Sequence, residues 1–179
     1  RDVVETLSGG LRRRVELAKG LMAGPKILIM DEPSTGLDPG ARRDLWHHLG
    51  RLKEEDGTTI LLTTHLMEEA GRCDRLAILD KGRIVSEGSP DGLRARIGGD
   101  VITIKTAAPE ELSAGIERRF GEKPRRVDGT LRIEREDGHS FIKQLVELFP
   151  AVIDTVSVGK PTLEDVFVRE TGHRFWTET

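Results

Sequence analysis

The sequence predicts an α/β protein in two parts: a mainly parallel sheet, followed by a small α+β unit of the ferredoxin-like type. In the first part, short apolar runs alternate with amphipathic helical patterns, as in a sheet built from β-α-β units. The second part reads strand-helix-strand-strand-helix-strand, which is the split ferredoxin-like order. Gly98-Gly99 interrupts the pattern between them, so the predicted domains are residues 1–98 and 100–179.

The first part begins with a helix and a buried strand. After Gly10, apolar residues recur at helical spacing until Gly24-Pro25 ends the pattern: Leu11, Val15, Ala18 and Met22. The apolar run 27–30 lies between two prolines, which is typical of a strand buried on both faces of a parallel sheet.

The later elements of the first part follow in chain order. The predicted ranges are a helix from Asp38-Pro39 to near Gly57, a strand at 59–63, a short helix at 67–71, strands at 76–79 and 83–87, and a short helix after Ser89-Pro90. The carboxyl ends of parallel strands meet at one edge of the sheet, where ligands gather.

The second part is predicted from the same kinds of signal. Its strands are expected at 101–105, 125–127, 130–134 and 152–158, and its helices at 109–120 and 140–149. A last helix at 163–169 starts with Thr162 and Asp165 placed as a capping box and stops by Gly172.

Composition limits the classes of function. The formal net charge of the 179 residues is −3, and the basic residues are spread along the chain, which disfavours a nucleic-acid partner. The single cysteine, Cys73, excludes an internal disulfide and fits a reducing compartment. No apolar run approaches the roughly 20 residues that a membrane-spanning helix needs.

Three polar residues are predicted to share one edge of the sheet. Asp31 and Glu32 end one strand and His65 follows another. Two adjacent carboxylates repel each other unless a cation or hydrogen-bond donors balance them. Asp31 is suited to hold Mg²⁺, Glu32 to polarise a water that attacks phosphorus, and His65 to bind a terminal phosphate oxygen. The alternative is a loop acid beside a histidine with a purely structural hydrogen bond.

A second candidate site precedes the first helix. Ser8, Gly9 and Gly10 form a glycine-rich turn before a basic helix, and unpaired N–H groups at a helix start can bind an anion. Such turns are often no more than helix caps.

These residues carry a resemblance to the ATP-binding-cassette (ABC) ATPases, in the run LSGGLRRRVELAKGLMAGPKILIMDEPSTGLDPGARRDLW and in the later TTILLTTH. Residues 7–10 match the family's signature motif, 27–32 its Walker B strand and 34–38 its D-loop, and His65 matches its switch histidine. Leu11 departs from the glutamine that usually follows the glycines, which we expect to tune the site rather than abolish it.

The resemblance implies a nucleotide sandwich with ATP and Mg²⁺ as cofactors. Two ATPase subunits would pair head to tail, with Ser8, Gly9 and Gly10 closing on the partner's ATP and Asp38 at the dimer seam. Glu32 would be the catalytic base and His65 a second catalytic residue of the chain's own site, with Asp31 as the metal ligand.

One motif of the family is absent from the sequence. No Gly-x-x-x-x-Gly-Lys-Ser/Thr run, the phosphate-binding Walker A loop, occurs among the 179 residues. We therefore expect the chain to be the C-terminal part of a longer ATPase. Its P-loop NTPase domain would be incomplete, and the chain by itself would be inactive. A strand that lacks its neighbour would expose apolar surface, so self-association is expected as well.

The second part resembles the C-terminal extension of drug-resistance exporter ATPases of the daunorubicin/doxorubicin type, especially at PTLEDVFVRETG. This implies a bacterial exporter ATPase that energises a separate integral membrane permease from the cytoplasmic face of the membrane. Two alternatives remain open: a soluble ABC ATPase acting on ribosomes or DNA, and a non-catalytic dimerisation or regulatory module.

Overall fold

The computed structural model describes residues 9–22 and 24–173, which divide into two compact units at Leu66/Met67. In the first unit the elements are α1 (Gly9–Leu21), β1 (Ile27–Asp31), α2 (Pro39–Glu55) and β2 (Thr59–Thr63). In the second they are α3 (Met67–Ala70), β3 (Leu76–Asp80), β4 (Arg83–Gly88), α4 (Pro90–Ala95), β5 (Asp100–Lys105), α5 (Pro109–Phe120), β6 (Arg125–Val127), β7 (Thr130–Arg135), α6 (Gly138–Leu148), β8 (Thr155–Gly159) and α7 (Leu163–Thr171). The α/β fold class predicted from the sequence is confirmed.

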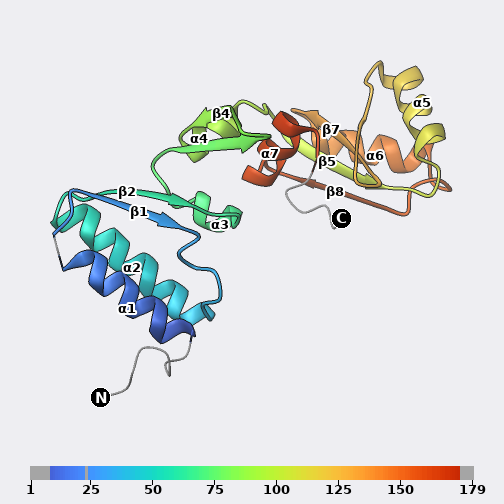
Figure 1. Cartoon of the computed structure of the whole chain (residues 1–179). Coiled ribbons are helices and arrows are strands. Elements are labelled where there is room, and N and C mark those ends of the chain that lie inside the picture. The colour runs from blue at the N-terminus through green and yellow to red at the C-terminus, as the bar shows by residue number, and fades with distance from the viewer. Residues whose placement is uncertain (1–8, 23, 174–179) are drawn as a thin grey trace. The chain divides into compact units, whose positions relative to one another are not determined.

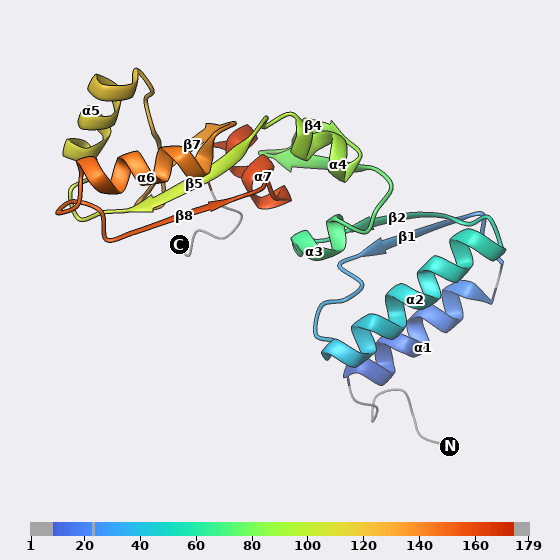
Figure 2. The same ribbon diagram turned by 180° about the vertical axis from the view of Figure 1, so that it is seen from behind.

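The first unit is a parallel pair of strands covered by helices on one side. Strand β1 pairs with β2 in parallel, from Ile27 opposite Thr59 to Asp31 opposite Thr63. Helix α2 buries Ala41, Leu45 and Leu49 against the apolar side chains of both strands. Helix α1 runs beside α2 on the same side (Figures 1 and 2).

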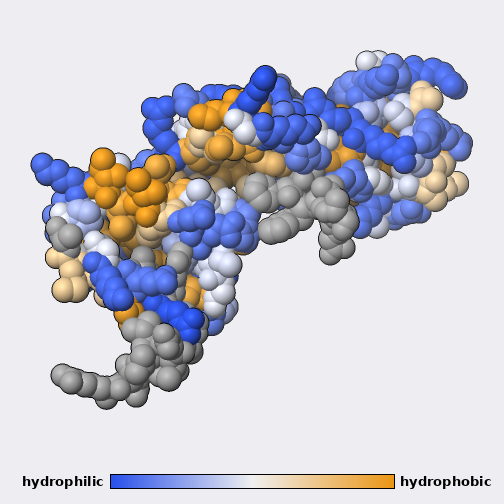
Figure 3. Space-filling model, in the orientation of Figure 1, coloured by the Kyte–Doolittle hydropathy of each residue, from blue (hydrophilic) through white to orange (hydrophobic). Residues whose placement is uncertain are grey.

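The other face of this strand pair is exposed. Ile29 and Leu61, which lie opposite each other in the register, keep 72% and 60% of their surface accessible, and Ile27 keeps 63%. Figure 3 shows hydrophobic residues gathered over β1 and β2. The prediction of a strand buried on both faces is therefore wrong for β1 here, because the described part of the chain covers only one face.

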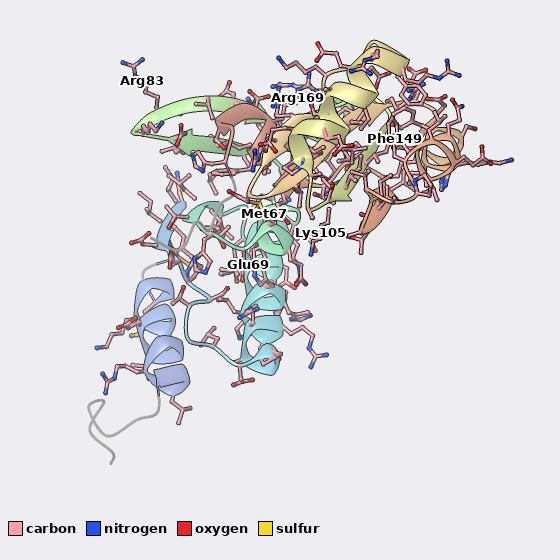
Figure 4. The ribbon with its side chains drawn as sticks, turned by 90° about the vertical axis from the view of Figure 1, so that its right-hand side faces the viewer. Met67, Glu69, Arg83, Lys105, Phe149 and Arg169 are labelled. Carbon is pink, nitrogen blue, oxygen red and sulfur yellow. The ribbon has the colours of Figure 1, made fainter. Side chains whose placement is uncertain are left out.

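The second unit contains an antiparallel hairpin and a four-stranded sheet. Strands β3 and β4 form the hairpin, and the side chain of Arg83 projects outward at its turn (Figure 4). The larger sheet has the antiparallel order β6-β7-β5-β8. With α5 and α6 in the connections, this is the predicted ferredoxin-like arrangement, which is confirmed.

The core of the four-stranded sheet is the most deeply buried part of the described residues. Ile102, Ile104, Leu112, Ile116 and Leu145 are fully buried there. Phe141 of α6 packs edge-on against Phe120 of α5, with ring centroids 4.7 Å apart. Alternating apolar residues on the strands and one apolar stripe on each helix account for this core.

The last helix closes a second core. Leu163, Val166 and Phe167 of α7 pack with the hairpin residue Ile78 and with Leu93 of α4. The predicted capping box is present, since Thr162 accepts from the Asp165 N–H and the Asp165 carboxylate accepts from the Thr162 N–H. Gly172 ends the helix in the left-handed conformation.

This second core explains why the compact units divide earlier than the predicted domains. Residues of β3 and α4, placed by the sequence in the domain 1–98, pack with Val101 of β5 and with α7. Contacts therefore group residues 67–98 with the ferredoxin-like unit. As a division between two functional domains, the boundary between 98 and 100 stays a prediction.

The described helices are all too short or too polar to cross a bilayer.

Candidate functional site

The acidic pair and the histidine lie together at the carboxyl ends of β1 and β2. Asp31 is the last residue of β1, and Glu32 follows it with a φ of +41°. His65 follows β2, and its Nδ1 lies 3.0 Å from Glu32 Oε1. The structure thus brings together the three residues that the sequence assigned to one sheet edge.

Both oxygens of the Glu32 carboxylate accept hydrogen bonds. His65 Nδ1 contacts Oε1, and Thr35 Oγ1 donates to Oε2 across 2.9 Å. For His65 to donate here, its proton must sit on Nδ1, which leaves Nε2 as an acceptor in the neutral ring. These bonds, first from His65 and then from Thr35, lower the pKa of Glu32 below its ordinary value. Glu32 is therefore an anion at neutral pH.

Thr63 joins the two acids from the neighbouring strand. Its hydroxyl accepts from the Glu32 backbone N–H at 3.0 Å and donates to an Asp31 carboxylate oxygen. Neither Thr63 nor Thr35 was among the residues predicted for the site. The sequence does show hydroxyl residues at the end of the strand and in the turn, which could have indicated a role in the site. The hydrogen-bond partners of these hydroxyls, however, depend on the strand register.

Asp38 has a clear structural role. Its carboxylate caps α2 by accepting from the N–H groups of Gly40 and Ala41, each at 2.9 Å. A capping aspartate before a proline is a common way to begin a helix. Its proposed place at a dimer seam stays a prediction.

The predicted glycine turn is only partly described. Ser8 lies outside the described residues, and Gly9 and Gly10 are the first residues of α1 rather than a turn before it. The N-terminal end of α1 lies away from the end of β1 in both ribbon views (Figures 1 and 2). The glycines are thus not part of the cluster that contains Glu32.

The oxygen atoms available at the site fit Mg²⁺ better than metals that prefer nitrogen or sulfur ligands. Among the described residues no three histidine, cysteine, aspartate or glutamate side chains are grouped to hold a metal ion. Asp31 and Thr63 nevertheless supply hard oxygen atoms at the strand ends. Mg²⁺ commonly uses one or two carboxylates, with water and substrate phosphates completing its shell. The site suits that kind of binding, not a protein-only cage.

Comparison with known proteins identifies relatives over nearly the whole chain. Residues 1–35 match the family model described as ABC transporter. The chain is 34% identical over 176 residues to the daunorubicin resistance ATP-binding protein DrrA2 of Streptomyces coeruleorubidus, covering 93% of this chain and 54% of that protein. It is 44% identical over 172 residues to the Nod factor export ATP-binding protein I of Rhizobium johnstonii, covering 94% of this chain and 53% of the relative.

A solved structure described as an ATP-binding subunit of an ABC transporter is 34% identical, with a TM-score of 0.47, covering 54% of this chain and 40% of the other. The chain spans about half the length of the curated relatives it matches. The family model and the sequence identity to the curated relatives confirm the resemblance to ATP-binding subunits of ABC transporters, including the daunorubicin-resistance type.

Proposed function

Starting from this similarity to ATP-binding proteins of ABC transporters, we propose that the chain is the C-terminal part of an ATP-hydrolysing subunit of a membrane exporter. The observation that carries the proposal is the Glu32 carboxylate, held at the end of β1 by His65 and Thr35 beside a second carboxylate. This arrangement offers an oriented anion to a water molecule at the edge of a parallel sheet, where ligands gather.

Glu32 acts on the attacking water in this proposal. One carboxylate oxygen accepts a hydrogen bond from the water. This bond orients the water so that the lone pair of the water oxygen points at the terminal phosphorus of ATP. Because the pKa of Glu32 is lowered, it works more by orienting the water than by removing its proton early. His65, through Nδ1, keeps the carboxylate in place. In the protonated ring both nitrogens carry a hydrogen, and Nε2–H would then donate to a phosphate oxygen.

Asp31 is the residue that would hold the metal. Bound Mg²⁺ would neutralise charge on the phosphates. Asp31, whose carboxylate accepts from the Thr63 hydroxyl, would bind this ion directly or through water.

Two copies of the subunit would complete two sites. The signature residues Ser8, Gly9 and Gly10 serve the partner's ATP, with Asp38 at the seam. Figure 1 shows the N-terminal end of α1 away from the carboxyl end of β1, which supports a role for the glycines in the partner's site rather than in their own. Anion binding at a helix N-terminus is a common property of such positions.

Coupling to transport belongs to the same proposal. Relatives whose names describe daunorubicin resistance and Nod factor export favour an exporter. The subunit would bind an integral membrane permease at the cytoplasmic face of the membrane, and no nucleic acid. We also propose that the 179 residues alone do not hydrolyse ATP, because no Walker A loop occurs among them.

The test is Glu32→Gln in a complete subunit that contains this chain, assayed with its permease. Glutamine keeps the shape but loses the charge, so turnover should fall by about 100-fold or more while ATP still binds. Glu55→Gln is the matched control, because Glu55 pairs with Arg51 on the exposed surface of α2. Normal turnover in the Glu32 variant would remove this residue from the reaction. An inactive wild-type subunit would overturn the proposed function itself.

A further inference from the structure

One hydroxyl group contacts both members of the acidic pair. Thr63 Oγ1 accepts a hydrogen bond from the Glu32 N–H at 3.0 Å and donates one to the Asp31 carboxylate. A threonine hydroxyl offers one donor and two acceptor positions, so it can make both bonds at once. A single side chain on β2 therefore constrains the last residue of β1 and the residue that follows it.

The register explains how Thr63 reaches both acids. Asp31 and Thr63 are the last pair of the parallel ladder between β1 and β2. Beyond this pair, the backbone turns sharply at Glu32, whose φ of +41° is uncommon for a residue with a Cβ atom. The Thr63 hydroxyl gives the N–H of this unusual residue an acceptor where the regular strand pairing stops.

Other contacts act on the Glu32 side chain and on its carbonyl group, which accepts from the Thr35 N–H at 3.1 Å, whereas the Thr63 hydroxyl binds the Glu32 N–H. Thr35 and His65 bind the two carboxylate oxygens. If the peptide before Glu32 could rotate, the Asp31 carboxylate would change direction although the bonds from Thr35 and His65 to Glu32 could persist. The two Thr63 bonds tie the Asp31 carboxylate to the Glu32 N–H through one hydroxyl group.

We propose that Thr63 is a positioning residue of the ATP-hydrolysing site, which sets the direction of the Asp31 carboxylate and the backbone turn that presents Glu32. This inference rests on the proposed function. Thr63 acts through the two acids rather than on the substrate. Its contribution should be visible in the turnover number, because misplacing reacting groups by about 1 Å can cost about 100-fold in rate.

The kinetic test compares Thr63→Val and Thr63→Ser in the complete subunit with its permease. Valine has the shape and strand preference of threonine but no hydroxyl, whereas serine keeps the hydroxyl. We expect kcat to fall about tenfold or more in the valine variant, with KM for ATP little changed, and the serine variant to recover most of the rate. Thr59→Val is the matched control, because Thr59 lies on the same strand at its other end, opposite Ile27.

A second measurement on the 179-residue chain separates this inference from the proposed function. Amide hydrogen exchange at Glu32 should lose its protection in Thr63→Val and keep it in Thr63→Ser and Thr59→Val. Unchanged exchange in Thr63→Val overturns the inference. An unchanged kcat in that variant does so too when the wild-type subunit is active. A wild-type subunit without ATPase activity overturns the proposed function and the catalytic purpose of Thr63, and the exchange result then shows only whether Thr63 holds the turn.

Discussion

The two compact units differ in how completely they bury their sheets. In the first unit, the core residues packed under α2 keep 4–8% of their surface exposed, and the opposite face of β1 and β2 is open. In the second unit, the core of the four-stranded sheet keeps only 0–5%. The candidate chemistry lies in the less completely buried unit. Stability within this chain is therefore expected to come mainly from the unit without the acidic pair.

The largest expected effect comes from separating the units. Residues 67–179 contain two cores and should fold alone, whereas the described part of residues 1–66 buries one face of two strands, and this segment should be largely unfolded. Far-UV circular dichroism and the dispersion of amide resonances would measure this. A cooperative thermal transition in the isolated segment 1–66 would contradict the comparison.

The next largest effect is expected from a substitution in the deeply buried core of the second unit. Phe141 is 1% exposed and contacts Phe120, so Phe141→Ala should lower the free energy of unfolding of this unit by about 3–5 kcal/mol. Urea denaturation of residues 67–179 is the measurement. Val146→Ala, on the same helix but 43% exposed, is the control and should change little. Equal effects of the two changes would show that α6 does not pack as described.

The third effect concerns the open face of the first unit. Ile29 and Leu61 lie side by side and exposed, so the 179-residue chain should self-associate through them. Replacing both with threonine should weaken association about tenfold or more, since burying one such side chain contributes about 1.5–3 kcal/mol. Sedimentation velocity over a range of concentrations would measure it. Leu79→Thr, which removes an exposed leucine of the hairpin, is the control, and a wild-type monomer at high concentration would refute the prediction.

The smallest expected effect is the loss of an ion pair in the second unit, whose contribution to stability depends on pH. The Lys160 ammonium, 2.8 Å from the buried Asp100, lowers the pKa of that carboxyl below its ordinary value. A lowered folded pKa stabilises the fold above the ordinary pKa of about 4, and this stabilisation is lost as pH falls through the folded pKa. Lys160→Met should therefore lower the melting temperature at pH 7 and have little effect near pH 2. The same shift at both pH values would exclude the ion pair as its cause.

Local patterns in the sequence predicted most elements within a few residues. The strand at 59–63, the helix at 109–120 and the short strand at 125–127 have the predicted ends, because each lies between clear turn or capping residues. The strand expected at 152–158 instead begins at Thr155. Val152 and Ile153 pack against the core from the preceding loop, so their apolar character did not indicate strand structure.

The candidate site was predictable in its charged residues and not in its hydroxyls. Asp31, Glu32 and His65 could be placed at one edge because parallel strands end together. The roles of Thr63 and Thr35 depend on which atoms face each other after the strands pair, and no spacing in the sequence encodes that. The exposure of Ile29 agrees with the expectation that a strand without its neighbour shows apolar surface, whereas the apolar run taken alone predicted burial on both faces, because it does not reveal what covers it.

The packing of α7 also bears on the order in which the second unit can fold. Val166 and Phe167 complete the core that Ile78 begins, although they are synthesised much later. Contacts between distant parts of a sequence slow folding and leave intermediates open to aggregation. During translation, the part of the hairpin's inner face that α7 covers stays exposed until that helix leaves the ribosome. Chaperone binding to the nascent chain would then be expected during this interval.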